Sequence, residues 1–191
     1  MAAGGERIPR LYTRTGDRGE TGLAGGQRLA KSAPRIRAYG TYDELGAHLG
    51  LVLAQLPEAL FEIRAVVRRL QDEVFVAQTE LAAAPRGPGP KHRITPAHIE
   101  RLEHEIDRFD ADHPPTRSFV VPGGSVASAE LHVARTVARR AERELHELHQ
   151  VEPVSPDLIA WANRISDLLF ALALATNHAL HIAESAPDYS A

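Results

Sequence analysis

The sequence predicts an all-α fold: a bundle of five helices preceded by an irregular, glycine-rich N-terminal segment. Apolar residues recur at helical intervals over five stretches, and segments containing proline or glycine separate these stretches. No apolar run with a two-residue period is long enough to predict a sheet. With 191 residues, the chain is most simply one domain with one core. We expect the N-terminal segment at 1–38, the bundle at 39–183 and a tail at 184–191.

The first helix is expected to begin at Thr41 and to end before Pro57. Thr41 and Glu44 have the spacing of a capping box, and leucine and valine then recur three or four residues apart. The residues before this point are rich in glycine and carry no sustained helical periodicity, so they are predicted to be irregular.

The other four helices also begin or end at recognisable signals. Thr95 and Ser155 each stand before a proline that fits the first helical turn, and Ser125 follows two glycines as a capping residue. A proline- and glycine-rich stretch at 85–90 ends the second helix. In chain order, these four helices are expected at residues 58–83, 96–109, 126–148 and 156–182.

Charge, cysteine content and hydropathy restrict the class of protein. The net charge is −3, from 22 basic and 25 acidic residues, so the chain lacks the basic excess typical of nucleic-acid-binding proteins and no nucleic-acid partner is expected. The absence of cysteine excludes disulfides, thiolate catalysis and cysteine-ligated metal centres. The N-terminus has no apolar targeting segment, and the longest strongly apolar run, 168–175, is far too short to span a bilayer. We expect a cytoplasmic protein with no membrane partner.

Four polar residues gather on one side of the expected fourth helix. At 100° per residue, they fall within an arc of about 80°. Two guanidiniums and a carboxylate in such an arc could line a site for a phosphate or carboxylate ligand. The alternative is a solvated face with helix-spaced ion pairs, each contributing about 0.3–0.5 kcal/mol, formed by Arg139, Arg140, Arg143, Glu144 and Glu147. Spacing alone leaves both interpretations open for His132, Arg135, Arg139 and Glu142.

The glycine-rich segment TRTGDRGETG at 13–22 also has two interpretations. It matches neither the P-loop pattern nor a dinucleotide-binding turn, because no strand is predicted before it. Threonine hydroxyls, glycine N–H groups and the ammonium of Lys31 could hold phosphate oxygens, and Asp17 could orient Mg²⁺-bound water or cap the loop. A loose N-terminal arm has the same composition.

Three further positions have structural interpretations of equal or greater weight. Asp43 is expected in the first turn of its helix, where a carboxylate stabilises the helix dipole. Asn163 borders an apolar run on the fifth helix and needs a hydrogen-bond partner or a ligand. Phe119, which stands between prolines, could be a loop anchor packed on the end of the bundle.

Taken together, five blocks of the sequence resemble the PduO-type family of ATP:cob(I)alamin adenosyltransferases. The first block is YTRTGDRGETGL, the fourth is LHVARTVARRAER and the fifth is NRISDLLF. The blocks follow the family's order from about residue 12 to 175, and the proline- and glycine-rich stretch near 85–93 falls where a variable connection is expected. They lie at residues 12–23, 31–45, 119–124, 131–143 and 163–170.

The resemblance implies an enzyme that transfers the 5′-deoxyadenosyl group of ATP to the cobalt of cob(I)alamin and releases triphosphate. It implies a homotrimer with active sites between subunits, with Mg²⁺ on the triphosphate and no residue of the chain assigned as a metal ligand of its own. A reductase that supplies cob(I)alamin from cob(II)alamin and an acceptor enzyme for adenosylcobalamin are implied partners. The residues expected to hold ATP are Thr13, Thr15, Gly16, Asp17, Lys31, Arg139, Glu142 and Asn163.

The resemblance also assigns the corrinoid side of the site. Asp43 is expected to pair with Arg135 across the subunit interface, and Phe119 is expected to displace the lower axial ligand of cobalt. Arg139 is expected to stabilise charge on the leaving triphosphate. No general base is expected, because Co(I) is itself the nucleophile. These four residues are the expected catalytic set.

Two rival classes share the helical architecture. A metal-carboxylate bundle would carry Glu-x-x-His pairs that face inward, and none of the ten histidines has glutamate three residues before it. A bundle that binds a cofactor without turning it over is the other rival. Turnover would separate that rival from an active enzyme.

Overall fold

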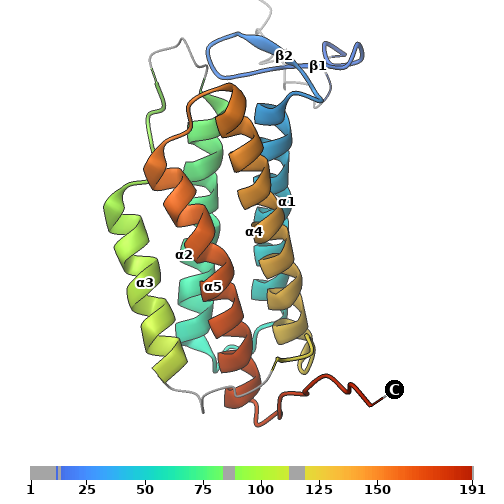
Figure 1. Ribbon diagram of the computed structural model, residues 1–191, viewed down its shortest axis with the longest axis vertical. Helices are drawn as coiled ribbons and strands as arrows, with labels where there is room; N and C mark the ends of the chain where they lie inside the picture. The colour runs from blue at the N-terminus through green and yellow to red at the C-terminus, as the bar shows by residue number, and fades with distance from the viewer. Residues whose placement is uncertain (1–11, 13, 84–88, 112–118, 191) are drawn as a thin grey trace, which may run out of the picture.

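The computed structural model describes residues 12, 14–83, 89–111 and 119–190. Five helices run along one long axis, and a small two-stranded hairpin lies at one end of the bundle (Figure 1). The prediction of an all-α five-helix bundle is therefore confirmed. The helices are α1 Pro34–Gln55, α2 Phe61–Ala82, α3 Pro96–Ala111, α4 Val126–Val151 and α5 Pro156–Ala179.

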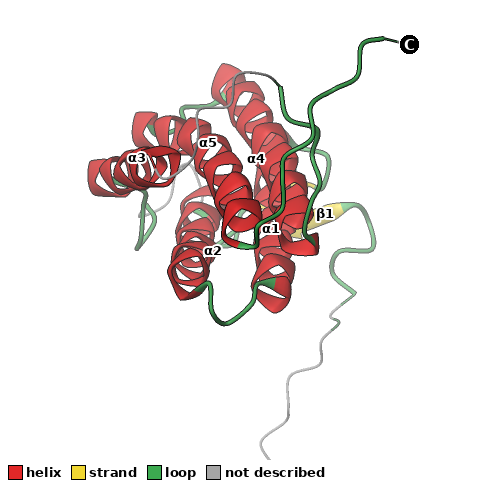
Figure 2. Cartoon of the chain, turned by 90° about the horizontal axis from the view of Figure 1, so that it is seen from below, coloured by secondary structure: helices red, strands yellow, loops and turns green. Residues whose placement is uncertain are grey.

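The helices pack around one shared core. α4 packs against both α1 and α5, α2 packs against α1, and α3 lies on the outer side of α5 (Figure 2). At the centre, the rings of Tyr42 and Trp161 stack with centroids 6.0 Å apart, and both side chains are fully buried. Burial of such large rings removes much apolar surface from water and so stabilises the bundle.

The first helix begins earlier than predicted. It starts at Pro34, which occupies the first helical turn, so the capping box proposed at Thr41 is wrong. Thr41 lies inside the helix and its hydroxyl donates to the carbonyl of Arg37 at 2.9 Å. The true start was missed because the prediction relied on apolar residues at helical intervals. Arg35 is buried in the first turn but is charged, so it did not count as a core position. Its guanidinium donates to Glu152 at 2.7 Å and to the carbonyl of Leu81 at 2.8 Å.

The hairpin was not predicted. Strand β1 Glu20–Gly22 pairs antiparallel with β2 Arg28–Ala30, and three-residue strands are too short to produce a detectable two-residue period. Gly25 and Gly26 turn the chain with φ of +100° and +87°, a region that favours glycine. Ala24 also pairs with Ala83 beyond α2, so the hairpin is fixed to the end of the bundle.

The remaining helix ends lie close to the predicted ones. Ser125 caps α4, because its hydroxyl accepts from the N–H of Ser128 at 3.1 Å. Ser155 precedes α5 without a side-chain capping bond. By length and hydropathy α5 could cross a membrane, contrary to the estimate from its central apolar run alone, but 67% of its most apolar window is buried inside the bundle. Its packing against α3 and α4 is that of a core helix.

Candidate functional site

The glycine-rich segment and Lys31 come together in the hairpin. The backbone N–H of Lys31 donates to the carbonyl of Gly19 at 2.8 Å, and Arg28 donates to the carbonyl of Thr15 at 2.7 Å. The ammonium of Lys31 lies 3.4 Å from where a Cβ on Gly16 would stand, so this glycine lets the amine approach the loop backbone. The structure thus joins three of the predicted ATP-binding positions, with exposed Asp17 in the same loop. Thr13 lies outside the described residues.

A cleft of about 400 Å³ opens between this hairpin and the first turns of α1. The ammonium of Lys31 provides positive charge in the cleft, and Thr21 adds a hydroxyl. The arrangement suits an anionic ligand. Tyr39 and Gly40 also belong to this site, although the sequence gave no reason to select them individually. The lining residues are Thr21, Gly22, Leu23, Lys31, Ile36, Tyr39, Gly40 and Ala82.

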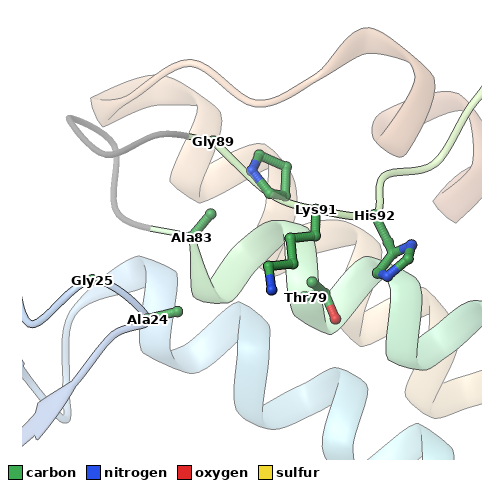
Figure 3. Close-up of a pocket in the computed structure, with 8 residues that line it drawn as sticks. Ala24, Gly25, Thr79, Ala83, Gly89, Lys91 and His92 are labelled. Atoms are coloured by element: carbon green, nitrogen blue, oxygen red, sulfur yellow. The ribbon is translucent and has the colours of Figure 1, made fainter.

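A second hollow, of about 470 Å³, lies over the last turn of α2 (Figure 3). Lys91 and His92 come from the segment before α3, and Thr79 comes from α2. None of the residues that the sequence predicted for the site lines this hollow. We assign the first cleft to the candidate site and not this one.

Glu142 and Asn163 meet between α4 and α5. The side-chain amide of Asn163 donates to Oε1 of Glu142 at 2.8 Å, so two predicted residues 21 positions apart form one polar pair. Arg139 lies one helical turn before Glu142 and is exposed. Among the described residues, no hydrogen bond or ion pair reaches the guanidinium of Arg139. This cation is therefore available for an anionic ligand.

Arg135 and His132 lie beside Phe170 of α5. The guanidinium carbon of Arg135 is 5.9 Å from the Phe170 ring centre, and the His132 ring is also 5.9 Å from it. Nε of Arg135 and both ring nitrogens of His132 are buried without a partner within the described part of the chain. Burial lowers the pKa of Arg135, and the nearby charge of Arg139 lowers it further. Burial likewise lowers the pKa of His132, and the charge of Arg135 lowers it further. Buried polar atoms of this kind normally find a partner.

Several charged residues of the fourth helix form ion pairs. Arg140 pairs with Glu44, and Arg37 pairs with Glu144 and Glu147, so these side chains form ion pairs between α1 and α4. The alternative of a solvated ion-pair face therefore fits this side of α4. Arg135 and Arg139 take no part in these pairs.

Asp43 does not lie in the first turn of its helix, so the proposed dipole-stabilising role is wrong. It stands in the middle of α1, is exposed, and accepts from the side-chain amide of Gln78 on α2 at 3.1 Å. Arg135 lies on α4 beside α5. Within the described residues the two side chains make no contact with each other.

Phe119 is 81% exposed, so the alternative that it packs on the end of the bundle is wrong for the described chain. It stands in the loop before α4, at the opposite end of the bundle from the hairpin (Figure 1).

This loop is held by Asn177, which the sequence analysis did not select. A polar residue directly after the long apolar run of α5 was the available signal.

The chain is similar to known proteins over nearly its whole length. The cobalamin adenosyltransferase family model matches residues 11–176. The corrinoid adenosyltransferase PduO of Citrobacter freundii is 44% identical over 172 residues, which are 90% of this chain and 51% of that protein. A second corrinoid adenosyltransferase of Citrobacter freundii is 42% identical over 183 residues, 95% of this chain and 99% of the relative. The chain thus spans about half the length of the PduO protein and nearly all of the second relative.

A solved structure shares the same fold. It is a PduO-type ATP:corrinoid adenosyltransferase from Lactobacillus reuteri, a phenylalanine-to-alanine variant complexed with cobalamin and ATP. It superposes with a TM-score of 0.87 at 30% identity and covers 93% of this chain and 99% of that one. An arginine-to-lysine variant of the enzyme from the same organism, complexed with ATP, also has a TM-score of 0.87. The chain belongs to the cobalamin adenosyltransferase family.

Proposed function

We propose that this chain transfers the 5′-deoxyadenosyl group of ATP to the cobalt of cob(I)alamin, forming adenosylcobalamin and releasing triphosphate. Family membership supports the reaction class, and the bound molecules named for the Lactobacillus reuteri structure are the two substrates. The observation that carries the proposal is the uncommitted guanidinium of Arg139 beside the Glu142–Asn163 pair. A cation held next to a fixed polar pair can orient a nucleotide polyphosphate.

The chemistry requires positioning more than proton transfer. The electron pair of Co(I) forms the bond to C5′ of ATP, and the bond from C5′ to the triphosphate oxygen breaks with its electron pair leaving on the triphosphate. No proton has to move at the reacting carbon, so the site needs no general base. The chain's contribution is to align the two substrates and to stabilise the charge that develops on the leaving group.

ATP is proposed to lie between the hairpin and the α4–α5 face. Thr15, Gly16 and Lys31 would hold phosphate oxygens through hydroxyl, N–H and ammonium groups, with Asp17 and Thr13 in the same loop. The guanidinium of Arg139 would bind the triphosphate, and the Glu142–Asn163 pair would orient the rest of the nucleotide. Each of these groups has chemistry that suits the role.

The two groups of residues imply that a second copy completes the site. The hairpin lies at the start of α1, whereas Arg139 belongs to the middle of α4, and no contact joins them among the described residues. We propose a homotrimer in which one subunit supplies the hairpin and its neighbour supplies the α4–α5 face. The unpartnered atoms of His132 and Arg135 support this assembly, because a neighbouring subunit could supply their hydrogen-bond partners.

The corrinoid is proposed to lie nearer the Phe119 end of α4. Asp43 of one subunit would pair with Arg135 of the next, because each is accessible or unsatisfied on its own chain. Exposed Phe119 would act as an apolar wedge that displaces the lower axial ligand of cobalt. Removing that electron-donating ligand makes Co(II) easier to reduce.

Mg²⁺ is proposed to accompany ATP. In residues 12, 14–83, 89–111 and 119–190, no group of three or more histidines or carboxylates is arranged to hold a metal ion. Mg²⁺ commonly binds substrate phosphates together with one or two carboxylates and water. Asp17 and Glu142 are the carboxylates at hand, and Mg²⁺ would neutralise charge on the triphosphate.

The setting of the reaction is also part of the proposal. We place the enzyme in the cytoplasm, where a reductase would supply cob(I)alamin and an adenosylcobalamin-dependent enzyme would accept the product. The buried core position of α5 supports a water-soluble bundle. No nucleic-acid or membrane partner is proposed.

The test is anaerobic incubation of the purified chain with ATP, Mg²⁺ and chemically reduced cobalamin. The expected result is the absorption spectrum of adenosylcobalamin together with one triphosphate released for each cobalamin converted. A reaction without protein provides the background rate. If the folded chain binds ATP yet produces no adenosylated product above background, the chain is a binding relative and not the enzyme.

A further inference from the structure

The chain beyond α5 returns along the loop that carries Phe119. α5 ends at Ala179, His181 adopts φ of +56°, and the chain reverses direction. Residues 182–190, named here the C-terminal strap, then pass residues 119–125, named here the Phe119 loop, before the chain end leads away from the bundle (Figure 2). The N–H of Val121 donates to the carbonyl of Ser185 at 2.8 Å, which makes an antiparallel bridge between the two segments.

Asn177 holds both segments with one buried side chain. It is 1% exposed, although amide side chains are usually exposed. Its Oδ1 accepts from the N–H of Ser125 at 3.0 Å. Its Nδ2 donates to the carbonyl of Gly123 at 3.1 Å and to the carboxylate of Glu184 at 3.0 Å. These three hydrogen bonds of the side-chain amide therefore all go to the Phe119 loop or to the C-terminal strap.

The fit between Asn177 and the loop is close. Gly124 has φ of +91°, and a Cβ at this position would stand 2.3 Å from Nδ2 of Asn177. Only glycine allows the loop backbone to approach the amide in this way. One hydrogen bond stands on each side of Gly124, to Gly123 and from Ser125, and together they fix the path of the loop backbone past Asn177.

Phe119 depends on this backbone path for its orientation. Its side chain is 81% exposed, so core packing does not hold it. The first fixed points after it are Val121, bound by the C-terminal strap, and Gly123, bound by Asn177. The bond between Val121 and Ser185 therefore restrains the backbone two residues from the ring. A loss of the strap contacts would release the ring without altering the core.

We propose that Asn177 and the C-terminal strap position Phe119 for the corrinoid side of the reaction. The proposal rests on the proposed function, and it assigns a role to residues beyond the stretch 11–176 that the family model matches. Asn177 and Glu184 are positioning residues, because they act through the Phe119 loop. The bonds that the structure gives to the strap go to Val121 and Asn177, neither of which is proposed to hold ATP, so ATP binding is expected to be independent of the strap.

Two truncations form a matched pair for the test. Removal of residues 184–191 deletes both strap contacts, those of Glu184 and Ser185. Removal of residues 187–191 keeps both contacts and serves as the control. A point-variant pair refines the comparison: Glu184→Gln keeps an oxygen that accepts from Asn177, whereas Glu184→Lys places a donor against a donor.

The measurements separate the corrinoid side from the ATP side. In the 184–191 truncation and in Glu184→Lys, we expect KM for cobalamin to rise by roughly tenfold, because small misplacements of a substrate-contacting group have large effects. The four-coordinate fraction of bound cob(II)alamin should fall, and Kd for ATP should stay within about twofold, since the hairpin is untouched. The 187–191 truncation and Glu184→Gln should match the wild type.

Two outcomes would overturn the inference. Equal losses of ATP and cobalamin affinity would mark the strap as a general stabiliser, and an unchanged KM and four-coordinate fraction in the folded truncation would leave it without a role in positioning. Hydrogen exchange at the amide of Val121 reports independently of turnover, and it should become faster only when Ser185 is removed. If the wild type shows slow exchange there but no adenosyl transfer, the proposed function fails while the structural hold of the strap stands.

Discussion

Asn163 of α5 donates its side-chain amide to Glu142 of α4 at 2.8 Å, one helical turn beyond Arg139. The bond fixes the carboxylate from a second helix, so Glu142 is directed toward Asn163. Arg139 is exposed, and among the described residues no ion pair engages its guanidinium. Uncompensated charge beside a fixed polar pair is an arrangement for binding an anion.

Arg139→Ala should weaken ATP binding by about 1.5–3 kcal/mol, or roughly tenfold to hundredfold in Kd, because a charge-assisted hydrogen bond to phosphate is lost. Isothermal titration calorimetry with ATP and Mg²⁺ measures this change. Arg108→Ala is the matched control, since Arg108 is an exposed arginine on α3 whose pairing with Glu62 lies outside the candidate site. Unchanged ATP affinity in Arg139→Ala would remove this residue from the phosphate site.

Phe119→Ala should leave ATP affinity nearly unchanged and should suppress four-coordinate cob(II)alamin. The ring is exposed and makes no core contribution, so its removal affects only what binds against it. Electron paramagnetic resonance of the protein with ATP and cob(II)alamin measures the four-coordinate population. Phe75→Ala, at another exposed phenylalanine on α2, is the control. A full four-coordinate population in Phe119→Ala would contradict the wedge role.

Asp43→Ala and Arg135→Ala should each abolish most turnover, yet mixed oligomers of the two should recover activity. If a site takes Asp43 from one subunit and Arg135 from the next, random mixing leaves about one quarter of the sites with both residues intact. Co-expression with two different purification tags yields these mixed oligomers, and the rate per site is the readout. The double variant is the inactive control. Recovery is impossible if both residues of a site belong to one chain.

The sequence predicted the helices better than the site. Five periodic stretches were sufficient to place the bundle, because periodicity reports which face of a helix is buried. The start of α1 was missed because Arg35 is buried only through its bond to Glu152, which lies 117 positions away. The contact between Glu142 and Asn163 could not be predicted for a similar reason. Sequence motifs identified both residues, but only the packing of α4 on α5 brings them together.

Glu73→Ala should lower the free energy of unfolding by about 2–4 kcal/mol. Glu73 is 3% exposed and accepts from the indole N–H of Trp161 at 3.0 Å and from Arg69 at 3.2 Å. Its removal leaves the buried indole N–H unpaired, whereas Arg69 keeps its bond to Glu105. Urea unfolding followed by tryptophan fluorescence measures the change. Glu62→Ala breaks an exposed ion pair and should cost less than about 1 kcal/mol. A loss no larger for Glu73→Ala than for this control would contradict the network's structural role.

His132 should make the fold less stable as the pH falls below about 6.5. Burial lowers the pKa of His132 below its ordinary value of 6.5, and the charge of Arg135 contributes in the same direction. Between the lowered folded pKa and 6.5, the unfolded chain binds more protons than the folded chain, so stability rises with pH across this interval. His132→Leu removes this group and should flatten the slope of unfolding free energy against pH between about pH 5 and 7. The two proteins differ only at residue 132, so the difference between the two slopes isolates His132. A His132→Leu curve parallel to the wild type would mean that His132 protonates as easily in the fold as in the unfolded chain.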